Sequence, residues 1–553
     1  MSDGLGKPIQ VVTMPGTTQE YQNSKGLPKV TRSICPECGK MIDAEYYEKD
    51  GKVYAKKTCP DHGEFDNVIW SDVKKYLEVE DFAMDGIGLV NPDDTTAEDS
   101  EDNVSIMIDN KKVKMQTCTA LANIDLTNRC NMTCPICFAD ANHAGYVYEP
   151  SYDEVIAMLK MLRDEKPIKC TAVQFSGGEP TVYPRFLDVV KAAKDMGFAQ
   201  VQAASNGIEF SKSVEFCRKA AEAGLNTIYL SFDGVSDDVY IQARNRKMFH
   251  IKLKVLENLR QLEHPPSVVL VPTVVKGMND SQLGKILEFA FENSDIIRGV
   301  NFQPVAFTGR ITREELEKGR FTLTDLIKNL HEQTGYVEDS DWYPVPVVAP
   351  VSKFASIIMG KNMVTFTTHP HCGLATYLFR DDKGNVTPIP RFVDVKKFMA
   401  GINELANKAA KSRFKKLYVL KAAKLMNKCI DESKMPEGMT KKSLTNILKN
   451  VISDKSKKTL ATFSWKMMFV GGMHFQDAYN YDISRVERCA IHYATPDLRV
   501  IPFCAYNGGP EYRNEIEKKF SMPLAEWKEK HKEEAKLLEQ ALIVPEDQRP
   551  DSQ

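Results

Sequence analysis

The sequence predicts an α/β fold, a partial (β/α)6 barrel of the TIM type, with an N-terminal metal-binding ribbon and a mostly helical C-terminal domain. Six short apolar runs alternate with amphipathic helical segments between residues 119 and 310, which is typical of parallel β/α units. Polar or glycine-rich motifs follow several runs, where barrel strands present their chemistry. Cysteines paired with proline and glycine near the N-terminus predict the ribbon.

Each β/α unit is predicted from one apolar run and the helical pattern after it. The strand candidates are residues 121–126, 171–175, 200–204, 227–232, 267–274 and 299–302. Helical patterns of suitable length include residues 152–163, 186–196, 213–223 and 281–292. Six repeats are fewer than the eight of a complete barrel, so the barrel should be partial.

The ribbon is predicted from two short cysteine motifs on either side of a hairpin. Cys35 and Cys38 form a C-x2-C pair, and Cys59 with His62 forms a C-x2-H pair. Three thiolates with His62 would suit structural zinc. A distant fourth cysteine such as Cys118 would instead suit a rubredoxin-like iron. The sequence leaves this choice open.

Changes in composition mark the expected domain boundaries. Residues 91–103 are acidic and almost without apolar side chains, so they are typical of a solvated linker. The expected parts are a flexible leader (1–28), the ribbon (29–90), an acidic linker (91–117), the barrel (118–310), a C-terminal domain (311–510), and surface helices with a tail (511–553).

The charge balance excludes a global attraction to nucleic acid, because 73 basic residues face 75 acidic ones. The first residues lack the pattern of a signal peptide, and thirteen cysteines fit a reducing compartment, so we expect a cytoplasmic protein. A lysine-rich helical region, residues 395–460, either packs with a solvated face or lies on an anionic membrane surface. Peripheral membrane association is therefore a second expectation.

A loop after the first predicted strand carries the strongest chemical signal. Cys130, Cys134 and Cys137 are spaced C-x3-C-x2-C, and three thiolates this close can hold three irons of a 4Fe-4S cluster while leaving the fourth iron open. A zinc knuckle is the alternative for the triplet alone. Gly177-Gly178-Glu179-Pro180 follows the second predicted strand, and together these motifs resemble the radical S-adenosylmethionine (SAM) superfamily.

That resemblance implies a 4Fe-4S cluster, SAM and an external electron donor such as ferredoxin or flavodoxin. Glu179 would accept a hydrogen bond from the SAM amino group, and the two glycines would allow close backbone approach. Ser205 and Asn206 would offer polar groups to the ribose or carboxylate, and Val275 would flank the adenine.

Further stretches resemble the archaeal tetraether lipid synthase family, which was formerly assigned to methylation of a pterin precursor. They are residues 145–152, 174–182, 269–277, 298–305, 308–310, 489–497 and 502–504. The resemblance implies activation of an inert C–H bond and C–C bond formation on an isoprenoid lipid, with auxiliary iron–sulfur centres. Its apolar cavity would be lined by aromatic and methionine side chains of residues 465–479.

The chain departs from that family where a cysteine-rich loop would precede the triplet, since only Cys118 is present there. Cys372, Cys489 and Cys504 stand as candidate ligands of one auxiliary 4Fe-4S cluster, and buried structural thiols are the alternative. Two further functions compete with lipid coupling. One is radical SAM methylation of a pterin, and the other is a non-catalytic iron–sulfur scaffold or electron carrier.

Overall fold

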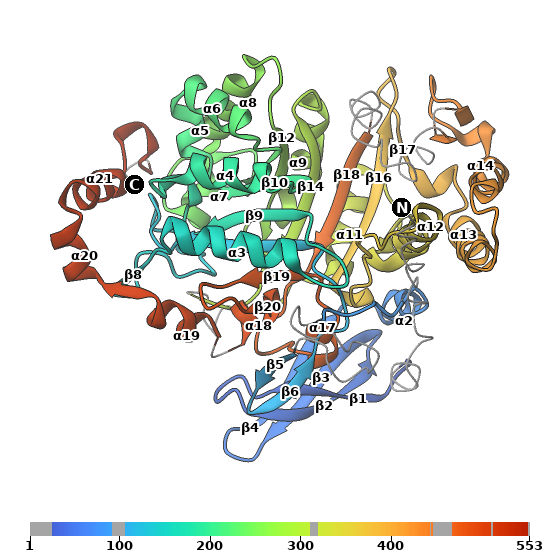
Figure 1. Cartoon of the computed structure of the whole chain (residues 1–553), viewed down its shortest axis with the longest axis horizontal. Coiled ribbons are helices and arrows are strands. Elements are labelled where there is room, and N and C mark those ends of the chain that lie inside the picture. Colours follow the sequence, from blue (N-terminus) through green and yellow to red (C-terminus); the bar gives the residue numbers. More distant parts are fainter. Residues whose placement is uncertain are drawn as a thin grey trace, which may run out of the picture.

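The computed structural model describes residues 25–90, 105–309, 319–442, 444–445, 467–509 and 512–550. Figure 1 shows a large sheet covered by helices, a small sheet beside one of its ends, and a helical group at the opposite edge from the C-terminal helices. Within the described ranges, no helix is long and apolar enough to cross a membrane.

Six parallel strands form the centre of the large sheet and follow one another in the predicted order, β7-β9-β10-β11-β12-β14. They are β7 Leu121–Thr127, β9 Ala172–Gly177, β10 Gln200–Ser205, β11 Thr227–Ser231, β12 Ser267–Val271 and β14 Ile297–Pro304. The fifth predicted strand is interrupted after Val271, and β13 Thr273–Val274 pairs separately with β14.

Helices connect these strands close to the predicted positions. They are α3 Tyr152–Asp164, α4 Phe186–Asp195, α5 Ile208–Lys212, α6 Val214–Ala223, α7 Asp237–Arg244, α8 Phe249–Arg260 and α9 Leu283–Glu292. Local signals explain several ends: Ser151 and Glu154 form a capping box at the start of α3, and Gly224 adopts a left-handed conformation at the end of α6.

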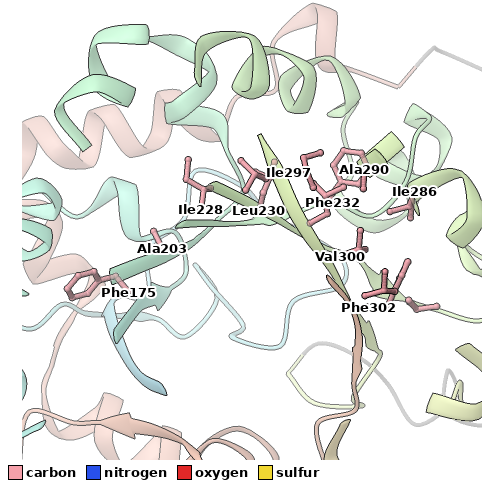
Figure 2. Close-up of a cluster of buried hydrophobic side chains, with 14 of the residues drawn as sticks. Phe175, Ala203, Ile228, Leu230, Phe232, Ile286, Ala290, Ile297, Val300 and Phe302 are labelled. Atoms are coloured by element: carbon pink, nitrogen blue, oxygen red, sulfur yellow. The ribbon is translucent and has the colours of Figure 1, made fainter. Parts of the chain in front are cut away.

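Alternation along the strands separates the core from the other face of the sheet. Phe175, Ala203, Leu230, Val300 and Phe302 are buried and pack towards the helices, and Figure 2 shows Ile297 and Phe232 meeting Ala290 of α9. Because successive side chains in a strand point to opposite faces, the residues between these apolar positions face away from the helices.

The C-terminal region differs from the prediction of a separate, mostly helical domain. Its strands extend the central sheet: β18 Met467–Met473 pairs in parallel with β14, and β19 Ile491–Ala494 pairs in parallel with β7. The other added strands are β15 Tyr343–Pro344, β16 Gly373–Arg380, β17 Val386–Pro388 and β20 Val500–Pro502. The result is a mixed α/β sheet longer than six strands, and closure into a barrel remains a prediction.

Further helices pack beyond the central strands. α11 Leu323–Thr334 contacts β14, β18 and α9, whereas α12 Ala349–Met359 and α14 Leu417–Cys429 both pack on α13 Val395–Ala410. The lysine-rich region is therefore two helices with an elbow at residues 411–416, not one long helix. Its predicted continuation from residue 446 to 460 lies outside the described residues.

The ribbon is a four-stranded antiparallel sheet in the order β1-β2-β3-β4. Its strands are β1 Lys29–Ile34, β2 Met41–Lys49, β3 Lys52–Cys59 and β4 Gly63–Trp70, and α2 Val73–Glu80 follows. The predicted leader, residues 1–24, lies outside the described residues. Part of the predicted linker is ordered, because β5 Ser105–Ile108 and β6 Lys111–Lys114 form a hairpin.

Short helices complete the C-terminal part of the described chain. They are α17 Ile483–Glu487, α18 Phe503–Gly508, α19 Tyr512–Lys519, α20 Leu524–Lys530 and α21 Lys532–Leu542. Between α19 and α20, β21 Ser521–Pro523 pairs with β8 Tyr146–Tyr148, which follows the cysteine loop. The last helices therefore lie beside β8 and the central sheet, as Figure 1 shows on its left side.

A buried carboxyl at the end of α3 makes stability depend on pH. Glu165 is 4% exposed, accepts a hydrogen bond of 2.8 Å from the Thr119 hydroxyl, and has a pKa raised to about 8 by burial. At pH values between the unfolded pKa, near 4.5, and the folded pKa, about 8, Glu165 is protonated in the folded chain and ionised in the unfolded chain. The free energy of unfolding therefore falls as the pH rises through this range.

We expect Glu165→Gln to remove this pH dependence, in which the free energy of unfolding falls by about 1.4 kcal/mol per pH unit between the two pKa values. Thermal unfolding at pH 5, 6.5 and 8 checks it. The Tm of the variant minus that of the wild type should grow with pH, and a constant difference would contradict the assignment.

Candidate active site

The three cysteines of the predicted cluster lie on a loop after β7 that is held by side-chain hydrogen bonds. The Asn142 amide donates to the carbonyls of Cys130 and Met132 at 2.8 and 3.0 Å, and its oxygen accepts from the Cys130 N–H at 3.0 Å. Asn142 adopts a left-handed conformation, which asparagine tolerates. One residue thus fixes the loop that presents the thiols.

Burial and charge shape the environment of these thiols. Burial, followed by the neighbouring thiol and carboxyl charges, raises the pKa of Cys130 well above its usual value. The pKa of Cys134 is also raised by burial, and Arg244 partly opposes this. Arg244 forms a bidentate ion pair with the fully buried Asp233 at 2.7 and 2.9 Å and donates to the Ile136 carbonyl at 3.0 Å. Cationic surroundings favour thiolates, which are the form that binds iron.

The Gly177-Gly178-Glu179 turn lies against the cysteine loop, and glycine is required there. A Cβ on Gly177 would lie 2.2 Å from the Thr127 carbonyl oxygen, and its φ is +123°. A Cβ on Gly178 would lie 2.3 Å from the Arg129 carbonyl oxygen. The Gly178 and Glu179 N–H groups donate to these same carbonyls at 2.8 and 3.0 Å. Close backbone approach is therefore the reason for both glycines.

Glu179 is 1% exposed and joins the turn to the end of β10. One carboxylate oxygen accepts hydrogen bonds from the hydroxyls of Ser205 and Thr181 at 2.9 and 2.6 Å, and the other accepts from the Asn206 N–H at 2.7 Å. Burial raises the pKa of Glu179 despite these bonds, so a nearby cation would stabilise its charged form.

Asn206 connects this carboxylate to the cysteine loop. Its amide donates to the Asn131 side chain at 2.7 Å, and Lys252 donates to its carbonyl at 2.6 Å. The Asn131 amide nitrogen is buried and lacks a hydrogen-bond partner among the described residues. Such a donor fits a site made for a polar ligand.

A cavity of about 350 Å³ contains most of these groups. Its walls include Cys130, Cys134, Cys137, Gly177, Gly178, Glu179, Ser205 and Asn206. Two predicted SAM-binding residues are not part of the wall: Pro180 begins a short 3-10 helix, and Val275 lies in the turn after β13. Thr273 and Val271 reach the cavity from that region instead.

The sequence reasoning missed a row of polar side chains on the cavity face of the central strands. Asn123, Gln174 and Gln202 lie opposite one another in the sheet register. The Gln202 amide donates to Gln174 at 2.7 Å, and the Gln174 amide donates to Asn123 at 2.9 Å. Along each strand, the polar residue stands next to apolar core residues, so it must point to the opposite face of the sheet. This alternation was the sequence signal that could have identified the row.

The row continues around the cavity on later strands. The Tyr229 hydroxyl accepts hydrogen bonds from the amides of Asn301 and Gln303, the latter at 3.5 Å, and all three residues line the cavity. Burial raises the pKa of Tyr229, so its hydroxyl stays protonated and can also donate.

An aromatic wall from the C-terminal region closes the other side of the cavity. Phe475 and Phe503 stack with ring centroids 4.1 Å apart, and Tyr493 lies 5.5 Å from Phe503. Of the residues predicted to line an apolar cavity, Met473 and Phe475 do so. Met468 is in the core, Tyr479 packs on the ribbon, and Trp465 lies outside the described residues.

In the ribbon, Cys35, Cys38, Cys59 and His62 place four ligand atoms within 4.8 Å of one another. Cys38 and Cys59 sulfurs are 3.9 Å apart, and the His62 Nδ1 lies 3.5 Å from the Cys59 sulfur. Tetrahedral zinc with Zn–S bonds of about 2.3 Å needs ligands about 3.8 Å apart. His62 thus completes the set, which favours zinc over iron with a distant cysteine.

Cys118, the alternative fourth ligand, lies elsewhere. Its sulfur is buried 3.8 Å from the carbonyl and hydroxyl oxygens of Thr365. Of the other three candidate auxiliary ligands, Cys372 and Cys504 lie close enough to Arg485 for their thiol charges to raise its pKa against the effect of burial. Burial, followed by the charges of Cys504 and Cys372, raises the pKa of Cys489. Nearby, Nε2 atoms of His474 and Gln476 are buried without partners among the described residues.

The comparisons with known proteins agree with this geometry. The radical SAM superfamily model matches residues 124–290, and a model described as the HMPTM N-terminal zinc ribbon domain matches residues 27–71. The chain is 45% identical over 507 residues to the 7,8-dihydro-6-hydroxymethylpterin dimethyltransferase of Methanocaldococcus jannaschii, covering 91% of this chain and 98% of that protein. The chain belongs to the family of that methyltransferase, within the radical SAM superfamily.

More distant matches are confined to part of the chain. A probable GTP 3',8-cyclase of Sulfurisphaera tokodaii is 26% identical over 276 residues, which is 47% of this chain and 81% of the cyclase. The Streptococcus suis protein SuiB, solved with its precursor peptide, matches 39% of this chain and 46% of its own at 16% identity and a TM-score of 0.32.

Membership of the superfamily makes the protein a radical SAM enzyme with a 4Fe-4S cluster and SAM as cofactors. The residues around the cavity fit both groups, since three thiols, a buried carboxylate and the Asn206 side chain line it together. The predicted tetraether synthase activity receives no support from these relatives, because the relative matched over nearly its whole length carries a pterin methyltransferase name.

A metal ion in the ribbon should also stabilise the position of an active-site segment. Lys57 is buried and donates to the carbonyl oxygens of Ile34 and Ala478, at 3.1 and 2.7 Å, and Ser33 donates to the Tyr481 carbonyl. These bonds join the cysteine knuckle to the segment that carries Gln476, a cavity residue.

We expect Cys38→Ser to lower bound zinc and to lower the Tm, because metal binding to a small ribbon contributes directly to its folding. Zinc content and thermal unfolding of the full chain measure the effect. Cys170→Ser, at a buried thiol outside the ribbon, should leave the zinc content unchanged, and equal zinc in both variants would refute the assignment.

Proposed function

We propose that this protein is a radical SAM methyltransferase that places a methyl group on carbon of a reduced hydroxymethylpterin. The observation that carries the proposal is the polar inner face of the sheet, formed by Asn123, Gln174, Gln202, Tyr229, Asn301 and Gln303. The 45% identity to the Methanocaldococcus jannaschii dimethyltransferase supports the same substrate class.

A pterin is flat, aromatic and rich in hydrogen-bond donors and acceptors. Side-chain amides both donate and accept, so the row from Asn123 to Gln202 can adapt to the ring edge. Phe475 and Phe503 offer flat surfaces against which such a ring can stack. An isoprenoid chain has no hydrogen-bonding groups and would use none of the donor and acceptor positions that these side chains still offer.

The residues around the cluster have separable tasks. Cys130, Cys134 and Cys137 would hold the cluster, Glu179 would bind the SAM ammonium, and Asn206 with Asn131 would orient the rest of SAM. When bound, the reduced cluster and SAM supply a 5′-deoxyadenosyl radical that removes a hydrogen atom from carbon. The aromatic and polar walls would limit the access of water to the reacting groups once the substrate is bound.

The auxiliary site around Arg485 is a second part of the proposal. Cys372, Cys489 and Cys504 would hold an iron–sulfur cluster, and the buried Arg485 guanidinium would offset the negative charge of the thiolates. Cys118, which lies beside Thr365, is not assigned to this cluster. Iron and sulfide per chain, compared between the wild type and Cys489→Ala, test the assignment.

The main experiment combines reconstituted, reduced enzyme with SAM and either 7,8-dihydro-6-hydroxymethylpterin or an isoprenoid diether lipid. We expect the pterin to gain the mass of one or two methylene groups, with label from methyl-labelled SAM. Coupled lipid chains without methylated pterin would replace the proposal by the tetraether activity. Absence of 5′-deoxyadenosine in both mixtures would leave only an iron–sulfur scaffold or electron carrier.

We expect Gln202→Leu to raise the KM for the pterin about tenfold, because one buried hydrogen bond contributes roughly 1 kcal/mol or more. SAM cleavage without substrate should be unchanged. Gln200→Leu is the matched control, since Gln200 lies two residues earlier on the same face of β10 and does not line the cavity. Equal KM values in both variants would contradict the pterin contact.

A further inference from the structure

The elbow between α13 and α14 exposes apolar side chains that the fold does not use. Phe414 is 72% exposed, Leu417 is 55% exposed and Leu420 is 64% exposed. Leu417 and Leu420 are three residues apart on α14 and so share one side of the helix. Phe414 lies just before the helix, and its carbonyl accepts a hydrogen bond from the Leu417 N–H at 3.1 Å. The opposite side of α14 is the packed one, with Ala422 and Cys429 buried against α12 and α13.

Basic residues surround these three side chains. Residues 411–430 contain seven cations and no acidic residue. The cations are Lys411, Arg413, Lys415, Lys416, Lys421, Lys424 and Lys428, and none of them forms an ion pair with another described residue. The lysines on either side differ: Lys408 pairs with Glu404, and Lys434 pairs with Asp431. The seven cations without ion-pair partners thus occupy the same segment as the three exposed apolar side chains.

We propose that this elbow and the outward side of α14 form a peripheral docking surface for an anionic lipid bilayer. Large apolar side chains ringed by lysines are the arrangement of interfacial helices, in which the apolar groups enter the acyl boundary and the cations meet lipid headgroups. Figure 1 shows α14 at the outer edge of the molecule, where a flat surface can reach it. The surface is separate from the cavity and does not depend on the pterin proposal.

Charge complementarity favours a bilayer over an acidic protein partner. Lysine side chains are long and flexible, so their charges can spread over a continuous anionic surface while the stems cover apolar contacts. None of the three exposed apolar side chains lines the active-site cavity or three other cavities of the described chain. Apolar side chains exposed outside a cavity can enter a lipid surface without a preformed complement.

The test is co-sedimentation of the full-length, metal-loaded protein with lipid vesicles. We expect binding to phosphatidylcholine vesicles with about 30 mol % phosphatidylglycerol, little binding to phosphatidylcholine alone, and weakening as salt is raised. No binding to the anionic vesicles would overturn the proposal.

Two variants separate the two contributions. Phe414→Ser/Leu417→Ser/Leu420→Ser and Lys411→Gln/Lys416→Gln/Lys421→Gln/Lys424→Gln should each lower the partition coefficient at least about tenfold. Leu537→Ser/Ile543→Ser is the matched control, because both residues are 64% exposed and belong to α21 or its C-terminal end. Figure 1 shows α21 on the opposite side of the molecule from α14, so this variant should not affect binding.

Each variant is checked for native circular dichroism and iron content, so that loss of binding is read on folded protein. Binding that depends on the lysines but not on the apolar residues would overturn the entry of the apolar side chains into the bilayer. Retention of full binding by both variants would overturn the assignment of the surface.

Discussion

Cys134→Ala abolishes 5′-deoxyadenosine formation if the triplet holds the catalytic cluster. The thiol lies in the wall of the cavity, beside Arg244 and opposite the Glu179 turn. With two thiolates left, a cuboidal cluster loses one of its three protein ligands, and the electron that cleaves SAM cannot be delivered. The variant should lose iron while keeping the zinc of the ribbon.

The measurement is iron, sulfide and zinc per chain, together with 5′-deoxyadenosine from SAM and a chemical reductant. Cys217→Ala is the control, because that thiol, on α6, is fully buried, donates to the Phe210 carbonyl of α5, and does not line the active-site cavity. Equal SAM cleavage by the Cys134 variant and the wild type would refute the placement of the cluster.

Glu179→Gln weakens SAM binding about 10- to 100-fold, because a hydrogen bond to a charged group contributes about 1.5–3 kcal/mol. The substitution keeps the shape of the side chain and most of its hydrogen bonds, and it loses the one from the Thr181 N–H at 3.2 Å. The glutamine oxygen can still accept from the Asn206 N–H, and the hydroxyls of Ser205 and Thr181 can rotate to accept from its amide. What the variant loses is the negative charge that a SAM ammonium requires.

Equilibrium binding of SAM to the cluster-loaded variant provides the readout, with the rate of 5′-deoxyadenosine formation as the second. Glu165→Gln is the matched control, since it changes an equally buried glutamate that lies outside the cavity wall. A Kd for SAM equal to that of the wild type would show that Glu179 only holds the turn.

The fold of the central region was predictable because its signals are local. Alternation of apolar residues fixed the six strands to within a few positions, and caps such as Ser151 and Gly224 fixed helix ends. The cysteine triplet and the two glycines could also be recognised from the sequence, because each motif consists of residues that are close together in the chain. The ribbon followed from two short motifs for the same reason.

The wrong or incomplete predictions concern residues far apart in sequence. Strands β18 and β19 join the central sheet across more than a hundred residues of intervening chain, so a separate C-terminal domain was the natural but incorrect expectation. Val275 was placed near the adenine by its position after a strand, yet the chain turns away from the cavity there. Pairing of distant segments has no local sequence signal.

By itself, the sequence determined the residues assigned to the radical SAM centre, namely three thiols, two glycines and Glu179, because all of them lie within local motifs. Tertiary structure alone decided what surrounds that centre. Register in the sheet aligned Asn123, Gln174 and Gln202 into one polar row, and the return of the C-terminal chain set Phe475 and Phe503 opposite it. Because a binding cavity is formed by side chains from distant strands, its chemistry appears only when the strands are paired.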